Sequence, residues 1–461
     1  MRGDRSSATK STVSFFTILT LFLFGAETAS FAVDLSRETA RNILSESMVA
    51  LLTGKEIDTA LGQRQQALRE ALRTGVIDKT ELAVMLEKSI LPILNQHKTS
   101  RYILKTLPEK VDSLLAPYME WNEVEAIMWK ACSSVIKDGQ KFELKLGTLA
   151  PPGTPWLVIP ETELLPKIEK LSNGKVFIKV YGGGVMGEDT DILRKMDIGQ
   201  LDGCGCTALG ILAACPEISA FLMPGLFNNY DEVDYVTEKF RERIDKYFKN
   251  RGYILAAMID TGFFNIYSKN KITGLNDLRN RRLLTWFGIV ETTLYKELGA
   301  NATPVAVPEV VAALSTGLAD TNLAPSAWML GMQAYQYANY FIRQPFLYSP
   351  AAVIVSTHVA DTFRKKFGLS EQLADNIVEL LVFEVCALET KWREHIRAYD
   401  EKCLKAFETK CGIKPVTLSQ EDLLAFSQAA VRVRTNLAGK AFPEDFMQEI
   451  LQALEEYRTR D

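Results

Sequence analysis

Residue types that carry catalysis or bind metals are sparse in this chain. It has three histidines, His97, His358 and His395, and none has a second histidine or a cysteine at metal-ligand spacing. His358 is therefore interpreted as an ordinary surface or core side chain. The sequence contains neither a GxSxG nor a GxxxxGK[ST] motif. We expect no catalytic residue, no metal and no cofactor, and hence no enzyme.

Glycine and cysteine offer two further features. The run Gly182-Gly183-Gly184 lacks the GxGxxG order, so a tight turn with close backbone approach is favoured over a nucleotide cradle. Seven cysteines are too few for a disulfide framework in a chain of this length. We expect Cys204 and Cys206 to point apart and not to pair. The helical spacing of Cys403 and Cys411 also argues against a bond between them.

Length and charge limit the classes of protein that need considering. A chain of 461 residues predicts two or three domains. The formal net charge is −4, and the longest basic run is 279–282, so no nucleic-acid partner is expected.

The first 32 residues have the pattern of an export signal. Arg2, Arg5 and Lys10 precede an apolar stretch at 13–24, and Ser30 and Ala32 provide small residues at the −3 and −1 positions of a cleavage site. We expect residues 1–32 to be a signal peptide and the protein to be periplasmic. The alternative is an uncleaved N-terminal membrane anchor.

Two different patterns follow the signal. Residues 33–140 read as an all-α domain of four or five helices, broken near Gly54, Gly75, Thr99 and Pro117, with a capping box at 78–81. From residue 141 strands and helices alternate, which predicts parallel sheet in an α/β fold. The stretch 370–410 has neither proline nor glycine and predicts one long helix. Strands are expected at 142–146, 175–180, 252–259, 281–286, 302–307 and 351–356.

Several phrases occur in an order that resembles the substrate-binding subunit of TRAP transporters (DctP-like solute receptors). They include Pro-Pro-Gly-Thr-Pro-Trp at 151–156, Gly-Gln-Leu-Asp-Gly at 199–203, Leu-Asn-Asp-Leu-Arg-Asn-Arg-Arg at 275–282 and Leu-Gly-Ala-Asn-Ala-Thr-Pro-Val at 298–305. Each phrase is weak alone, but the ordered set is specific and covers residues from about 142 onward.

The resemblance implies a two-lobed periplasmic-binding-protein fold of class II type, with a long lobe-crossing helix after the helical domain. It implies a first lobe at 141–264, to which about 350–390 returns, and a second at 265–349, on which about 391–461 packs. It also implies a small-molecule solute and two TRAP membrane subunits, one small and one large. By analogy alone, the helical domain could serve an accessory helical-repeat protein.

Three positions depart from the pattern of the family. Leu284 stands where the resemblance places an arginine that clamps a substrate carboxylate through two parallel hydrogen bonds. Phe264 stands where a second arginine often follows Gly-Phe, and Asn322 begins Asn-Leu-Ala-Pro where the family has Glu-Asn-Pro. An unpaired buried carboxylate is costly, so the resemblance with these changes predicts an apolar or aromatic solute.

Candidate ligand-binding residues follow from this alignment, although several of the aromatic ones could equally be core packing. They are Trp156, Phe227, Phe263, Phe264, Leu284, Trp286, Phe287, Asn322 and Trp328, with Cys206 and Thr207 as weaker candidates. Two rivals stay open: a carboxylate receptor that uses Arg282 or Arg343 as the clamp, and an interaction or sensor protein that acts through its helical domain.

Overall fold

The computed structural model describes residues 36–286 and 288–460. The expected signal peptide and Phe287 lie outside the described residues. Within the described part, no helix combines the length and the apolar character that crossing a membrane requires.

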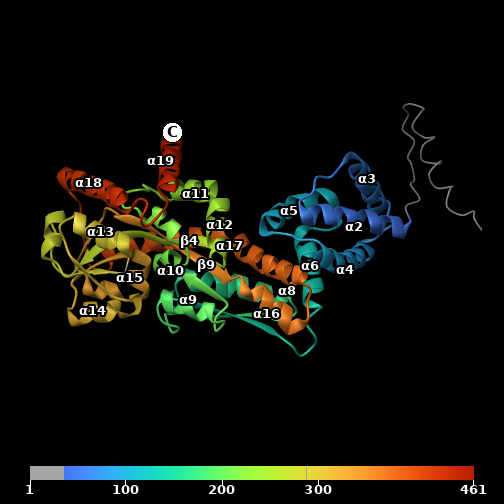
Figure 1. Cartoon of the computed structure of the whole chain (residues 1–461), viewed down its shortest axis with the longest axis horizontal. Helices are drawn as coiled ribbons and strands as arrows, with labels where there is room; N and C mark the ends of the chain where they lie inside the picture. The colour runs from blue at the N-terminus through green and yellow to red at the C-terminus, as the bar shows by residue number, and fades with distance from the viewer. Residues whose placement is uncertain (1–35, 287, 461) are drawn as a thin grey trace, which may run out of the picture.

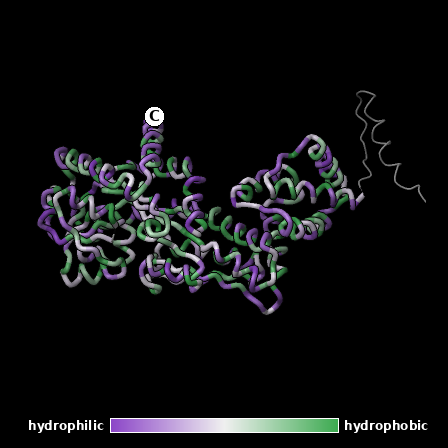
Figure 2. Tube along the Cα trace, in the orientation of Figure 1, coloured by the Kyte–Doolittle hydropathy of each residue, from purple (hydrophilic) through white to green (hydrophobic). Residues whose placement is uncertain are grey.

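The N-terminal domain consists of five helices and lies at one end of the elongated molecule (Figure 1). The first four of these helices end close to the predicted breaks, and Asp78 caps its helix by accepting a hydrogen bond from the Glu81 amide at 2.8 Å. In Figure 2 hydrophilic and hydrophobic residues alternate along these helices, as expected where one face is buried. The helices are α2 (Arg37–Thr53), α3 (Thr59–Arg73), α4 (Lys79–Gln96), α5 (Arg101–Leu115) and α6 (Trp121–Ser133).

The rest of the chain forms a mixed sheet of ten strands covered by helices. The main strand order is β2-β1-β3-β9-β4-β7-β5-β6, and β8 joins β4 and β10 at the side. The strands are β1 (Phe142–Thr148), β2 (Val176–Tyr181), β3 (Gly203–Cys206), β4 (Tyr253–Ser268), β5 (Leu283–Thr285), β6 (Ala302–Pro304), β7 (Thr321–Pro325), β8 (Tyr340–Ile342), β9 (Leu347–Ser356) and β10 (Lys414–Val416).

Two clusters of parallel strands make the two lobes. β1 pairs in parallel with β2 and β3, whereas β5 pairs in parallel with β6 and β7. The antiparallel strands β4 and β9 join the two clusters: β9 pairs with β3 and with most of β4, and the end of β4 pairs with β7. The expected two-lobed α/β fold is thus confirmed. The lobe boundaries at residues 264 and 349 stay predictions.

Helices flank both clusters, and those of the second cluster gather at the end of the molecule opposite the helical domain (Figure 1). They are α7 (Pro155–Ile159), α8 (Leu165–Leu171), α9 (Asp189–Asp197), α10 (Ala208–Ala214), α11 (Tyr230–Lys239), α12 (Arg241–Asn250), α13 (Ile289–Glu297), α14 (Val310–Thr316), α15 (Ser326–Gly331), α16 (His358–Phe367), α17 (Glu371–Thr409), α18 (Gln420–Leu437) and α19 (Glu444–Arg458). Short π or 3-10 turns are η2 (Pro160–Leu164), η3 (Pro216–Leu222), η4 (Leu275–Asn280), η5 (Val307–Glu309) and η6 (Ala334–Tyr337).

The long helix α17 has 39 residues and therefore extends about 58 Å. It packs against α4 and α5 near its start, against β4 and α7 along its middle, and against α15 and β10 further on. The predicted lobe-crossing helix is confirmed, and it also carries the helical domain.

Polar contacts fix the helical domain to α17. The Asn376 amide donates to the carbonyls of Leu94 and His97 at 2.7 and 2.8 Å, and its oxygen accepts from the Thr99 amide at 3.1 Å. The Trp129 indole donates to the buried Glu384 carboxylate at 2.8 Å. Because these groups are buried, their partners are costly to remove.

We therefore expect Asn376→Ala to lower the free energy of unfolding by about 1–3 kcal/mol, since three backbone groups lose their partner. Urea denaturation measures the change, and Glu394→Ala, at an exposed position of the same helix, serves as the control. Equal stability of both variants would contradict a role for Asn376 in docking.

Candidate functional site

A cavity of about 100 Å³ lies between the two strand clusters. Leu146, Ile178 and Cys206 contribute from the first cluster, whereas Trp286 and Trp328 contribute from the second. β4, β9, α7, η2 and α17 complete the wall. Its only side chains with polar atoms are those of threonine, cysteine and tryptophan; no Lys, Arg, Asp, Glu or His of the described residues lines it. Residues 37–133 do not contribute to it either, so in the described part the helical domain does not form its wall.

Four tryptophans line the cavity, and two of them have a clear partner. The Trp156 indole donates to the Asp260 carbonyl at 2.8 Å, and the Trp392 indole donates to the Pro155 carbonyl at 3.0 Å. Trp286 and Trp328 pack against each other with ring centroids 5.0 Å apart. Aromatic rings supply large apolar area with few rotatable bonds.

Five of the predicted residues come together at this cavity: Trp156, Cys206, Thr207, Trp286 and Trp328. Phe264 lies next to Trp286, with ring centroids 5.2 Å apart. It lines a second, smaller cavity of about 20 Å³, whose wall also includes Thr207 and Trp286. Thr207 and Trp286 line both cavities and therefore lie between them.

Of the other predicted positions that the structure describes, Phe227, Leu284 and Asn322 lie in the core, and Phe263 is partly buried against it. Leu284 is fully buried in β5, where it pairs with Asn322 of β7, and neither lines the cavity. Phe227 packs on Tyr348 with ring centroids 5.6 Å apart, and Phe263 packs on Tyr230 at 4.9 Å. The phrase at 275–282 predicted the strand that carries Leu284 but not the face that its side chain takes.

The two arginines considered as alternative clamps are engaged elsewhere. Arg282 pairs with Asp320 at 3.2 Å and keeps 62% of its side chain exposed. Arg343 pairs with Glu408 at 2.8 Å with 55% exposed. Neither lines the cavity.

The expectation for Cys204 and Cys206 is wrong, because the two form a disulfide bond. Residues two apart in a strand point to the same face, so β3 brings their sulfurs together. Asp189 lies beside them and accepts hydrogen bonds from the amides of Thr207 and Gly210, at 2.9 and 3.1 Å. The three residues place one possible ligand atom each within 4.8 Å, but bonded sulfurs offer no thiolate to a metal.

Gly182 to Gly184 form a turn against the first lobe, in agreement with the sequence interpretation. The Gly183 amide donates to the Ala150 carbonyl at 2.9 Å, and the Gly184 amide donates to the Thr148 carbonyl at 3.0 Å. A Cβ at Gly182 would come within 2.6 Å of the Leu157 side chain. The glycines therefore permit close backbone approach.

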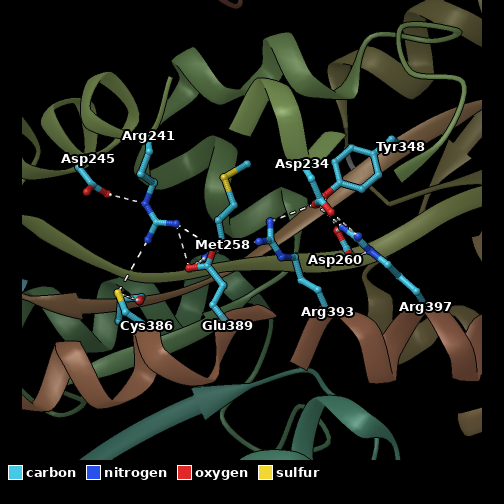
Figure 3. Close-up of polar contacts among 11 residues, drawn as sticks. Asp234, Arg241, Asp245, Met258, Asp260, Tyr348, Cys386, Glu389, Arg393 and Arg397 are labelled. Atoms are coloured by element: carbon cyan, nitrogen blue, oxygen red, sulfur yellow. Dashed lines mark hydrogen bonds and ion pairs between the residues drawn. The ribbon is translucent and has the colours of Figure 1, made fainter. Parts of the chain in front are cut away.

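The Asp260 carbonyl that accepts from Trp156 belongs to a residue of a buried ion-pair network (Figure 3). The fully buried Asp260 carboxylate of β4 accepts from Arg397 of α17 and from the Tyr348 hydroxyl of β9, both at 2.7 Å. Arg397 also contacts Asp234 of α11 at 2.7 Å. Burial raises the pKa of Asp260, and Arg397 works against that rise.

The network continues along α17 toward the helical domain (Figure 3). Glu389 accepts from Arg241 of α12 at 2.9 Å and from the Met258 amide of β4 at 3.2 Å. Arg393 contacts Asp234 at 3.2 Å. These contacts hold α17, β4 and the helices α11 and α12 in one arrangement. Sequence reasoning missed them because the partners lie more than 100 residues apart.

Glu291 is a further carboxyl group that lies close to the cavity without lining it. Glu291, on α13, accepts a hydrogen bond from the Trp286 amide at 2.9 Å and lines the smaller cavity. Burial raises its pKa from 4.5 to about 7, and the Trp286 amide opposes the rise.

Comparison with known proteins gives one family. The sequence pattern described as bacterial extracellular solute-binding protein, family 7 (DctP) matches residues 146–440. The ectoine-binding periplasmic protein of Halomonas elongata is 24% identical over 263 residues, which are 56% of this chain and 74% of that protein. A solute-binding protein of Chromohalobacter salexigens is 23% identical over 244 residues, 52% of this chain and 70% of its own.

Solved structures share the fold. The sugar acid-binding protein of Advenella mimigardefordensis in complex with galactonate has a TM-score of 0.59 at 20% identity, over 69% of this chain and 99% of that one. A TRAP periplasmic solute-binding protein of Desulfovibrio salexigens with bound orotic acid has a TM-score of 0.59 at 18% identity, with the same coverage.

Removing the cation of the network should be costly. We expect Arg397→Met to lower the free energy of unfolding by about 3–5 kcal/mol, because Asp260 keeps a buried carboxylate without its cation. Chemical denaturation measures this loss. Arg432→Met breaks the partly exposed pair with Glu297 and should cost about 0–1 kcal/mol. If Arg397→Met lowers the free energy of unfolding no more than Arg432→Met does, Arg397 does not compensate the buried charge of Asp260.

The raised pKa of Glu291 makes the free energy of unfolding depend on pH, and the direction of this dependence follows from the shift. The folded state holds this proton up to about pH 7, whereas the unfolded state releases it near 4.5. The folded state thus binds more protons in this window, and stability falls as pH rises through it. Denaturation at pH 5 and pH 7.5 should show a smaller fall for Glu291→Gln than for the parent chain. Exposed Glu309→Gln should leave the slope unchanged.

Proposed function

Since this chain belongs to family 7 of the bacterial extracellular solute-binding proteins, the DctP family, we propose that it is the receptor of a TRAP-type transporter and that its solute is apolar or aromatic. Proteins of this family bind solutes and are not enzymes, and this chain is a solute-binding protein. Its relatives by fold hold acids, galactonate in one and orotic acid in another. The kind of solute is therefore the point that the cavity has to decide.

The composition of the cavity wall carries the proposal. No charged side chain of the described residues lines the space between the lobes, and four tryptophans do. A carboxylate transferred into such a space without a cationic partner loses its hydration at a cost of several kcal/mol. An apolar ring, in contrast, gains about 25 cal/mol for each Å² removed from water.

The carboxylate-receptor alternative receives less support. It needs a guanidinium within reach of the cavity, and both Arg282 and Arg343 are largely exposed and paired with acidic side chains. The carboxyl group of Glu291, which lies outside the wall, would repel an anion when ionised.

Partners and location follow from the family. TRAP solute-binding proteins deliver small solutes to membrane subunits, and we propose that this chain does so in the periplasm, with one small and one large subunit, after removal of residues 1–32. The helical domain is then free to meet an accessory helical-repeat protein, because it does not line the cavity in the described part.

Native mass spectrometry with extraction of the ligand tests the class of solute. We expect an uncharged apolar compound to co-purify with the protein from its host. Leu165→Arg should reduce the occupancy of this compound at least tenfold, because the new guanidinium adds a charge to the apolar wall. The position is half-buried, so the charged group can still reach solvent.

Ile198→Arg is the matched control, since this side chain is 73% exposed and does not line the cavity. Co-purification of a carboxylate that survives in the control and is strengthened by Leu165→Arg would overturn the proposal.

A further inference from the structure

Polar atoms without partners gather in the second strand cluster, beside the cavity. Eleven buried side-chain N or O atoms of the described residues lack a hydrogen bond, and five of them belong to residues between 285 and 328. They are Thr285 Oγ1, Trp286 Nε1, Tyr295 OH, Asn322 Oδ1 and Trp328 Nε1. Thr285 ends β5, and Trp286 and Trp328 follow the carboxyl ends of the parallel strands β5 and β7. Ligands of open α/β sheets bind outside the carboxyl ends of strands.

Two of these atoms belong to side chains that line the cavity itself. Trp286 and Trp328 are 5% and 4% exposed, and their indole N–H groups find no acceptor in the described residues. The other two tryptophans of the wall, Trp156 and Trp392, donate to backbone carbonyls. A buried donor without a partner is destabilising, so such groups usually meet a ligand, an ordered water or a protein acceptor.

The charges around the cavity limit what kind of acceptor this is. A carboxylate would offer oxygen acceptors, but it would find no cation among the described residues of the wall. A cation would find no carboxylate in the wall, and a cationic N–H group could not accept a hydrogen bond from either indole. An oxygen or nitrogen acceptor on an uncharged molecule fits both the charge and the two donors.

The volume of the cavity limits the size of the solute. An apolar cavity of about 150 Å³ in another protein holds one benzene ring, and this cavity measures about 100 Å³. This cavity is smaller than the one that holds benzene, so a molecule of about one ring is the upper limit of size, and a substituted ring fits only with some outward movement of the wall.

We propose that the solute is an uncharged, single-ring or similarly small apolar molecule with a carbonyl-type or ether-type acceptor, and that Trp286 and Trp328 determine specificity by donating their indole hydrogens to it. This inference rests on the proposed apolar-solute function and adds the polar feature by which the receptor selects among apolar molecules. Sites built to pair a polar group of the substrate discriminate strongly against analogues that lack it.

Three probes of similar shape separate the effect of a hydrogen-bond acceptor from the effect of charge. Acetophenone is neutral with an acceptor, ethylbenzene is neutral without one, and benzoate is an anion. Isothermal titration of the purified protein should show acetophenone binding roughly tenfold tighter than ethylbenzene, as expected for one or two hydrogen bonds. Benzoate should bind more weakly than either.

Phenylalanine variants identify the donors. Trp286→Phe and Trp328→Phe should each reduce the acetophenone-to-ethylbenzene ratio at least threefold, since they keep a ring and remove the N–H. Trp392→Phe is the control, because its N–H is already paired with Pro155 and the ratio should be retained. In the parent chain, the indole N–H resonances of Trp286 and Trp328 should move on adding acetophenone more than on adding ethylbenzene.

The outcomes separate the two proposals. Equal binding of acetophenone and ethylbenzene overturns the acceptor inference and leaves an apolar receptor, with water as the partner of the indoles. Preferred binding of benzoate overturns both. No binding of any probe overturns the single-ring assignment and removes the support of the cavity for the apolar class.

Discussion

Asp260 imposes the constraint on which the rest of the structure depends. Its carboxylate is fully buried in β4, one of the two strands that join the clusters, at a place where pairing with β9 shifts register and Gly262 takes a φ of +121°. An unpaired charge there would be prohibitive, so Arg397 of α17 and Tyr348 of β9 must stay in contact with it. Through its carbonyl, the same residue holds Trp156 in the cavity wall.

The same constraint accounts for the apolar cavity. Acidic and basic side chains near the lobe junction pair with one another in contacts among α17, β4, α11 and α12. They include Asp234, Glu389 and Arg393. α17 turns these charges toward β4 while Val385 and Trp392 of the same helix line the cavity. The guanidinium groups of Arg393 and Arg397 on α17 pair with Asp234 and Asp260, and neither lines the cavity.

The sequence predicted the elements better than the site. Strands with alternating residues and the 370–410 helix were found because periodicity and the lack of glycine and proline are local signals. The resemblance placed Trp156, Trp286 and Trp328 next to strand ends, and all three line the cavity. Leu284 stays a prediction: it lies in the core, and β5 has only three residues, too few to show from the sequence which face is buried. Arg397 was missed because its partners Asp234 and Asp260 are 163 and 137 residues away. Cys204 and Cys206 were misjudged through the facing rule for strands.

The position of the helical domain follows from the same helix. In the described residues, its polar contacts run to α17, to Lys167 of α8, to Asp245 of α12 and to the Leu255 carbonyl at the start of β4. All of these lie on the side of the first strand cluster, away from Trp286 and Trp328. A domain fixed to one lobe moves with that lobe when a cleft opens or closes, so it does not oppose the motion. Binding of a partner to these helices and binding of a solute in the cavity are therefore compatible, and the long helix α17 is the physical connection between them.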